Sequence, residues 1–160
     1  MELGKDILET EIKGLRVKTL KRFVDERGDF REIVRTTDPG FQGFSQLSTS
    51  VVYEGIAKAW HLHWDQTESM TCFIGIVKFA FCDRRKESST YNKVIDFVVD
   101  SRANPMLFTF EPGIAHGYRV IHGPAVIGYL TNRIYDPKDQ FRVDPNSPDI
   151  NYYWGPPAVV

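Results

Sequence analysis

From residue 55 to residue 68 the sequence reads Gly55-Ile56-Ala57-Lys58-Ala59-Trp60-His61-Leu62-His63-Trp64-Asp65-Gln66-Thr67-Glu68. In a β-strand, His61 and His63 point to the same face, because side chains alternate with a period of two. A carboxylate, Glu68, follows five residues after the second imidazole. This stretch therefore predicts a strand that carries polar, chemically active side chains to one end of a sheet.

Short apolar runs with turn residues between them extend on both sides of this stretch. Aromatic residues make up 13% of the chain, and such residues favour pleated surfaces. A helical period is absent apart from one short turn expected at 7–12. The pattern predicts a single all-β domain over residues 1–160, a sandwich or barrel with an irregular proline-rich tail from 144. Strands are expected at 15–20, 33–35, 50–53, 70–74, 77–83, 94–99, 107–110, 118–121 and 126–130.

Composition excludes several classes of protein. Twenty Lys and Arg against 21 Asp and Glu give a net charge of -1, whereas nucleic-acid binders usually carry a basic excess. Apolar runs stay far below the 18 residues of a membrane span, and the charged first residues are unlike a signal peptide. Two cysteines, Cys72 and Cys82, do not make a disulfide framework. We expect a cytoplasmic protein with no nucleic-acid or membrane partner.

A second polar cluster reads Glu111-Pro112-Gly113-Ile114-Ala115-His116-Gly117-Tyr118 and begins as a turn before it re-enters a strand. Together, the two clusters offer three imidazoles and one carboxylate. A 3-His-1-Glu set suits Fe, Mn, Ni, Cu or Zn and leaves positions open for substrate. The alternative for any one histidine is a hydrogen-bonded structural role. The residues alone leave both interpretations open.

The spacing of both clusters resembles the cupin superfamily of jelly-roll β-barrels. Its first motif is Gly, five residues, His-x-His, three or four residues, Glu, six residues, Gly. This pattern is matched by Gly55, His61, His63, Glu68 and Gly75. The second motif, Pro-x-Gly-x-x-His, is matched from Pro112 to His116 with one residue missing. The resemblance implies a jelly roll.

A narrower resemblance, from about Leu15 to Tyr135, is to the dTDP-4-dehydrorhamnose 3,5-epimerase family, whose members are dimeric, metal-free cupins of dTDP-L-rhamnose synthesis. Tyr129 and Tyr135 keep the spacing of that family's two active-site tyrosines. The segments of this chain that resemble the family's other motifs are Asp25-Glu26-Arg27-Gly28-Asp29-Phe30-Arg31-Glu32, Gln46, Ser50, Gly55 to His61, Asp83-Arg84-Arg85, Ser89-Thr90-Tyr91 and Pro112 to Tyr118. The resemblance implies an isomerase that inverts C3, C5 or both in a nucleotide-linked 4-keto-6-deoxy sugar, with no cofactor and as a homodimer.

The resemblance also implies roles for individual residues. His61 would be the catalytic base and Tyr135 the acid on the opposite face of the sugar. An imidazole suits the base because its ordinary pKa lies near neutral pH. The residues expected to hold or line the nucleotide-sugar site are Arg27, Phe30, Glu32, Gln46, Lys58, His116 and Tyr129.

The sequence departs from the family at four places, and these departures define two alternatives. Lys58 stands where the family has an arginine, Trp60 and His63 differ from the family's residues beside the base, and Glu68 or a neighbour stands where it has a lysine. The family's C-terminal Ser-x-Lys-Asp element, which pairs the base with a carboxylate, is not found, and Asp144 and Asp149 are the candidates to replace its aspartate. The first alternative is a metal-dependent cupin enzyme with one divalent transition metal. Its ligands would be His61, His63, Glu68 and His116. The second is a catalytically idle cupin that binds sugar nucleotides.

Overall fold

The computed structural model describes residues 6–156, which fold almost entirely into strands. The single helical segment in this range is the 3-10 turn η1 (Pro137–Asp139). The strands are β1 (Ile7–Glu9), β2 (Leu15–Thr19), β3 (Arg22–Asp25), β4 (Gly28–Arg31), β5 (Gln46–Val52), β6 (Ala57–Leu62), β7 (Glu68–Asp83), β8 (Val94–Asp100), β9 (Met106–Phe110), β10 (Ile114–Thr131) and β11 (Phe141–Arg142). The all-β prediction is confirmed. The extent of the single domain, 1–160, stays a prediction because its ends lie outside the described range.

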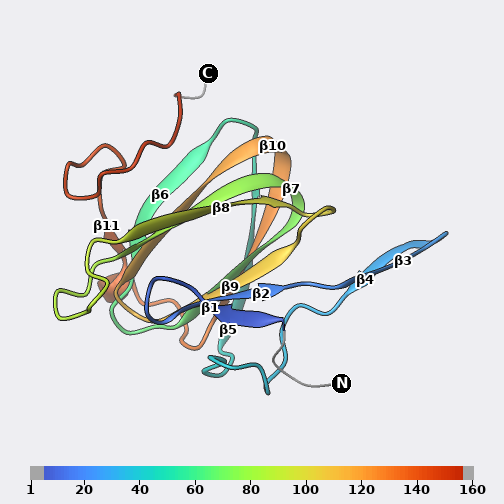
Figure 1. Cartoon of the computed structure of the whole chain (residues 1–160), viewed down its shortest axis with the longest axis horizontal. Helices are drawn as coiled ribbons and strands as arrows, with labels where there is room; N and C mark the ends of the chain where they lie inside the picture. The colour runs from blue at the N-terminus through green and yellow to red at the C-terminus, as the bar shows by residue number, and fades with distance from the viewer. Residues whose placement is uncertain (1–5, 157–160) are drawn as a thin grey trace.

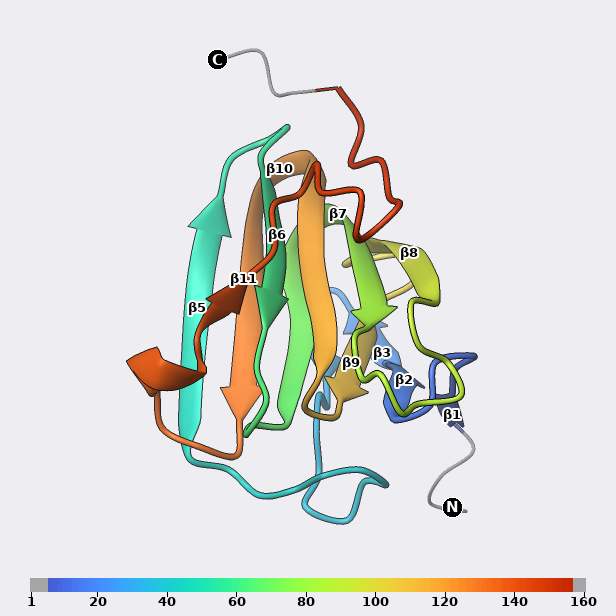
Figure 2. The same cartoon turned by 90° about the vertical axis from the view of Figure 1, so that its left-hand side faces the viewer.

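Two long strands, β7 and β10, pair along their whole lengths and pass from one layer of the fold to the other (Figures 1 and 2). The first half of β7 pairs with β9, and the second half pairs with β8. Likewise, the first half of β10 pairs with β6 and the second half with β5. One layer is therefore β1-β2-β9-β7-β10-β5, and the other is β8-β7-β10-β6-β11. This is a jelly-roll arrangement, as the cupin resemblance implied.

Both long strands were expected as two separate strands each, with breaks near Gly75 and Gly123. Gly75 has a φ of +107°, and a Cβ there would lie 2.9 Å from the backbone oxygen of His122. The glycine thus permits a bend in a close approach of two backbones, and pairing with β10 resumes on the other side. Gly75 therefore marks a bend within β7 and not the end of a strand.

Three other expectations were wrong. Residues 7–12 were expected as a helical turn, but Ile7–Glu9 form β1 because they pair with β2. Residues 33–35 lie outside any strand. Instead, β3 and β4 form a separate hairpin that extends away from the body of the molecule (Figure 1). Finally, β5 starts at Gln46 rather than at residue 50, which brings more polar side chains onto the sheet.

The main core lies between the two layers and is rich in aromatic rings. Phe108 contacts Phe79, Phe81 and Phe97 with ring centroids 5.0 to 5.1 Å apart. Removing one such ring typically costs about 3–5 kcal/mol. A smaller cluster forms where the irregular C-terminal segment packs on β6, with Trp60 and Trp154 centroids 4.7 Å apart. This second cluster holds the strand that carries His61.

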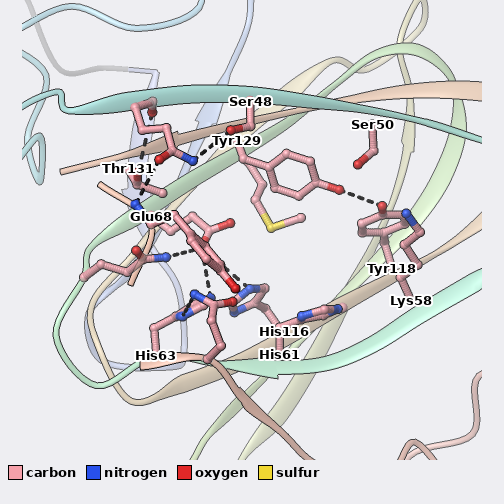
Figure 3. A pocket seen from close by; sticks show the side chains of 16 residues that line it. Ser48, Ser50, Lys58, His61, His63, Glu68, His116, Tyr118, Tyr129 and Thr131 are labelled. Atoms are coloured by element: carbon pink, nitrogen blue, oxygen red, sulfur yellow. Dashed lines mark hydrogen bonds and ion pairs between the residues drawn. The ribbon is translucent and has the colours of Figure 1, made fainter. Parts of the chain in front are cut away.

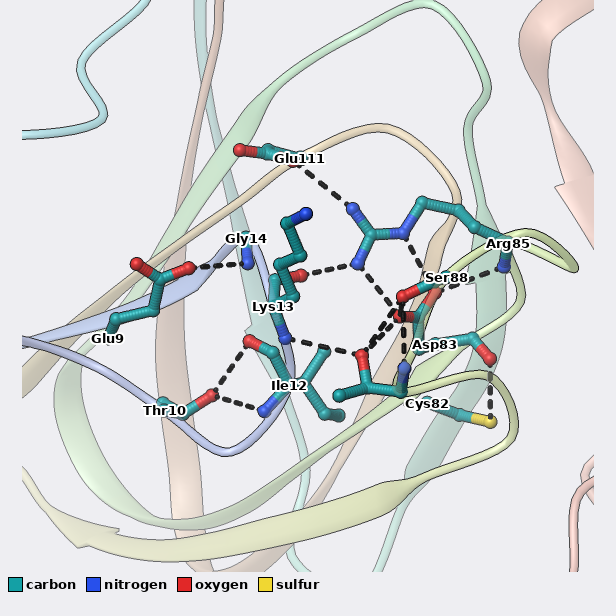
Figure 4. Close-up of polar contacts among 11 residues, drawn as sticks. Glu9, Thr10, Ile12, Lys13, Gly14, Cys82, Asp83, Arg85, Ser88 and Glu111 are labelled. Atoms are coloured by element: carbon teal, nitrogen blue, oxygen red, sulfur yellow. Dashed lines mark hydrogen bonds and ion pairs between the residues drawn. The ribbon is translucent and has the colours of Figure 1, made fainter.

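A buried carboxylate, Asp83, ties three loops together at the end of β7 (Figure 4). It accepts five hydrogen bonds, from the backbone N, Nε and Nη2 of Arg85 and from the hydroxyls of Ser88 and Thr90. Arg85 also donates to the Glu111 carboxylate at 3.1 Å and to the backbone oxygen of Lys13. The network fixes the loop that leads into β10 and therefore the position of His116.

Two further predictions concern membrane-spanning segments and the state of the two cysteines. Within residues 6–156, no helix has both the length and the apolar character that a membrane crossing requires. Cys72 and Cys82 are both buried and unpaired, and burial raises the pKa of each thiol. Neither is therefore activated as a thiolate.

Candidate functional site

A cavity of about 250 Å³ lies beside the end of β6, the start of β7 and both ends of β10 (Figure 3). Its walls come from β5, β6, β7 and β10 and from the segment after β10. All of its lining residues except Met70 and Gly117 carry a side-chain nitrogen or oxygen atom, which suits a ligand with many hydrogen-bonding groups. The lining residues are Gln46, Ser48, Ser50, Lys58, His61, His63, Gln66, Glu68, Met70, His116, Gly117, Tyr118, Tyr129, Thr131, Tyr135 and Gln140.

Strand register brings the two polar clusters of the sequence together. His116 on β10 pairs directly with His61 on β6, and their rings stack with centroids 6.1 Å apart. His63 follows the end of β6, and its ring lies 5.6 Å from that of His116. Glu68 at the start of β7 pairs with Thr131 on β10. The alternation predicted for His61 and His63 is confirmed, since both line the cavity.

Three of these side chains form a compact buried group. The Oε2 atom of Glu68 lies 3.6 Å from His63 Nε2 and 3.8 Å from His116 Nε2. Each imidazole also contacts a backbone oxygen through Nδ1, at 2.6 Å to Asp139 for His63 and at 3.1 Å to Ile114 for His116. These carbonyl contacts fix the orientation of both rings.

Burial shifts the pKa of three side chains that line the cavity. It lowers the pKa of His116 to about 3, with the neighbouring His63 adding to the effect. It raises the pKa of Glu68 to about 7, against a hydrogen bond from Gln66 that lowers it. For His61, burial followed by the positive charge of Arg142 lowers the pKa to about 4. His61 is therefore neutral at pH 7 and has a lone pair available to accept a proton.

The opposite wall carries hydroxyl groups. The hydroxyls of Tyr118 and Tyr129 are 2.6 Å apart, and burial raises the pKa of both groups. Gln46 connects this wall to the cavity mouth: its Nε2 donates to Ser48 Oγ at 3.0 Å, and its Oε1 accepts from the backbone N of Tyr135 at 2.9 Å. Tyr135 itself is 60% exposed and stands at the mouth.

Most predicted site residues meet in this cavity, but one group does not. His61, Tyr135, Gln46, Lys58, His116, Tyr129, His63 and Glu68 all line it. By contrast, Arg27, Phe30 and Glu32 lie on or beside the β3–β4 hairpin, outside the cavity of their own chain. The metal alternative named four ligands, and the structure groups three of them, with His61 beside the group.

Sequence reasoning missed several lining residues. Ser48, Tyr118 and Thr131 each lie two residues from a predicted site residue on the same strand. The period of two would have found them, once the strand bounds were known. Gln140 carried no such signal, because it reaches the cavity from the irregular segment after η1.

In the part of the chain that the structure describes, His61 is not paired with a carboxylate as the family pattern requires. Among residues 6–156, the ion pairs and hydrogen bonds leave His61 without a carboxylate partner. Asp144 and Asp149 were candidates, but Asp144 Oδ1 accepts from the backbone N of Asn146 instead. Arg142 pairs with His61 in the strand register, so the group beside it is a cation.

Comparison with known proteins decides the family. The sequence profile described as dTDP-4-dehydrorhamnose 3,5-epimerase matches residues 9–160. The chain belongs to the dTDP-4-dehydrorhamnose 3,5-epimerase family. The predicted family and epimerase function, and the assignment of the protein as an isomerase, are thereby confirmed.

Curated relatives of this epimerase family differ in how their names describe them. The spore coat polysaccharide biosynthesis protein SpsL of Bacillus subtilis is 34% identical over 146 residues, which cover 89% of this chain and 96% of that protein. A protein named dTDP-4-dehydrorhamnose 3,5-epimerase from Streptomyces griseus is 27% identical over 89% of this chain and 74% of its own.

Solved structures of the family share the fold. The dTDP-4-dehydrorhamnose 3,5-epimerase of Elizabethkingia anophelis superposes with a TM-score of 0.83 at 26% identity, covering 95% of this chain and 87% of that one. The 4-keto-6-deoxy sugar epimerase NovW of Streptomyces spheroides gives a TM-score of 0.84 at 25% identity, over 94% of this chain and 80% of its own. The jelly roll is therefore the family's fold.

Proposed function

We propose that this protein inverts C3, C5 or both of a nucleotide-linked 4-keto-6-deoxy sugar, of the dTDP-4-dehydro-6-deoxyglucose type. The observation that carries the proposal is a neutral imidazole, His61, in the same cavity as Tyr135, in a chain that the epimerase profile matches over residues 9–160. The name of the Bacillus subtilis relative supports a place in polysaccharide biosynthesis. The two buried unpaired thiols support a cytoplasmic location.

His61 acts as the base in this proposal. The hydrogens on carbons beside a ketone are acidic because the resulting charge spreads onto the keto oxygen. His61 removes one of them, and a second group on the other face of the ring returns a proton with inversion. The Lys58 ammonium lines the same cavity and stabilises the negative oxygen of the enolate electrostatically. No cofactor takes part in this sequence of proton transfers.

Tyr135 is the proposed acid, and its replacement separates removal of the proton from inversion. We expect Tyr135→Phe to lower the rate of inversion about 100-fold. Exchange of the same hydrogen with solvent continues, because His61 still removes and returns it on one face. In D2O, NMR would show deuterium entering the substrate without product. Equal loss of exchange and inversion would contradict the assignment, and Tyr53→Phe, an exposed tyrosine outside the cavity, is the control.

The direct test of the function is incubation of the protein with dTDP-4-dehydro-6-deoxyglucose in D2O. Deuterium at C3 or C5 and the inverted product are expected, and the positions labelled show whether one or two carbons react. Binding of the nucleotide sugar with no exchange would instead identify an idle sugar-nucleotide binder. The matched control is the same incubation with dTDP-glucose, which lacks the keto group and therefore has no acidic hydrogen.

The proposal includes a homodimer in which the β3–β4 hairpin completes the partner's site. The hairpin extends away from its own body (Figure 1), and Phe30 on it is 65% exposed. Phe23 and Val24 on the same hairpin are exposed as well, and an exposed apolar patch of this kind marks a contact surface. Such an arrangement would let Arg27, Phe30 and Glu32 contact the nucleotide, although they lie outside the cavity of their own chain.

Sedimentation equilibrium tests the dimer. We expect twice the mass of one chain for the wild type, and a shift toward monomer for Phe30→Asp with binding of the nucleotide sugar weakened about tenfold or more. Tyr53→Asp, at an exposed aromatic position away from the hairpin, serves as the control. A wild type that sediments as a monomer, or a Phe30→Asp protein with unchanged affinity, would refute the arrangement.

A further inference from the structure

The buried group of His63, Glu68 and His116 has an arrangement that the proton transfers above do not use. A backbone oxygen can only accept a hydrogen bond, so the Nδ1 atoms facing Asp139 O and Ile114 O carry the protons. The Gln140 amide nitrogen is also near His63 Nδ1, but at 3.3 Å it is farther than the 2.6 Å carbonyl. In this tautomer the lone pair of each ring is on Nε2, the atom that faces Glu68.

These two Nε2 lone pairs face the Glu68 carboxylate, which is itself an acceptor. The three ligand atoms lie within 4.8 Å of one another, and all three residues are buried. A single positive centre between these atoms would contact all three of them. A proton on Glu68 can form a hydrogen bond to only one of the two imidazoles, whereas a divalent cation can be coordinated by all three atoms at once. Hydrogen bonds from the far ring nitrogen to backbone carbonyls are also how metal-binding histidines are held.

The donor set defines the class of ion. Two imidazoles and one carboxylate with open positions suit Fe, Zn and neighbouring divalent transition metals. Oxygen-preferring ions such as Mg²⁺ are disfavoured, because two of the three donors are nitrogen. The cavity of about 250 Å³ lies directly against the group and leaves room for further ligands.

We propose that His63 Nε2, His116 Nε2 and a carboxylate oxygen of Glu68 bind one divalent transition-metal ion whose remaining positions face the cavity. This differs from the four-ligand set expected from the sequence, because His61 lies outside the group. His61 stays available as the base. A cation held there would supply a Lewis acid for an oxygen atom of a bound ligand. The site goes beyond the proposed epimerase function and does not depend on it.

The test uses the untagged full chain, stripped with a chelator and titrated with Co²⁺, whose visible absorption reports its ligands. We expect one cobalt per chain. Glu68→Gln and His63→Gln should weaken the affinity about 100-fold or more, since even the loss of a supporting group costs 10- to 100-fold. The matched control is His122→Gln, because His122 is 72% exposed and pairs with Glu54 away from the cavity. Elemental analysis after dialysis against Zn²⁺ or Mn²⁺ checks the stoichiometry.

A wild type that retains less than about a tenth of an equivalent of each metal at protein concentrations used for such titrations would overturn the site. So would a Glu68→Gln protein that binds cobalt as tightly as the wild type. A second measurement needs no variant: electron spin echo spectra of the wild type loaded with Cu²⁺ should show two coupled imidazoles. Coupling to none would overturn the site even if the variants failed to fold. None of these results depends on epimerase activity.

Discussion

His61→Ala is expected to lower the rate of solvent exchange at the sugar carbons about 10⁴-fold, at the upper end of what a general base contributes. Burial keeps His61 neutral at pH 7, and His61 is the proposed base that removes the hydrogen from the carbon beside the keto group. Deuterium uptake from D2O, followed by NMR on dTDP-4-dehydro-6-deoxyglucose, measures the loss. Binding of dTDP should change little, because the nucleotide contacts are assigned to other residues.

The matched control is His122→Ala, which removes an exposed imidazole and should exchange at the wild-type rate. Exchange by His61→Ala at the wild-type rate would reject His61 as the base. Cobalt binding by the same variant adds a second readout. The three-ligand site predicts that His61→Ala keeps its cobalt, whereas a site with His61 as fourth ligand predicts weaker binding.

The second large effect concerns stability. We expect Asp83→Ala to lower the free energy of unfolding by about 3 kcal/mol, because it removes the carboxylate that accepts hydrogen bonds from Arg85 and two hydroxyls. Asp83 is fully buried, so water does not replace the lost contacts. Urea unfolding followed by circular dichroism at neutral pH gives the difference. As control, Glu11→Ala removes an ion pair with Lys93 on the surface and should leave the unfolding midpoint unchanged.

The stability that Asp83→Ala loses relative to the wild type should also depend on pH. Burial opposes ionisation of Asp83, but hydrogen bonds from Arg85, Ser88 and Thr90 outweigh it and lower the pKa below the ordinary 3.8. A lowered pKa adds stability that is complete above pH 3.8 and is lost as the pH falls toward the folded-state pKa. The gap between wild type and Asp83→Ala should therefore shrink in acid. A gap that stays constant down to pH 2 would show that the charge does not matter.

Local sequence was a good guide to the polar clusters but not to the strand bounds. His61, His63 and His116 were predicted as site residues because they interrupt apolar runs near turns, and all three line the cavity. The breaks expected near Gly75 and Gly123 were wrong, since pairing partners on both sides of a bend keep a strand continuous. The β3–β4 hairpin was missed for a similar reason: its apolar residues are exposed, so no buried face sets a pattern.

The sequence by itself determined the fold class, which follows from the spacing of strands and turns, and the types of side chain at the site. Its resemblance to known motifs indicated the family. Only the tertiary structure decided which of those residues act together. It grouped His63 with Glu68 and His116, left His61 beside them without a carboxylate, and placed Phe30 outside its own cavity. The physical reason is that strand register and two backbone carbonyls orient these rings, and contacts between distant segments set both.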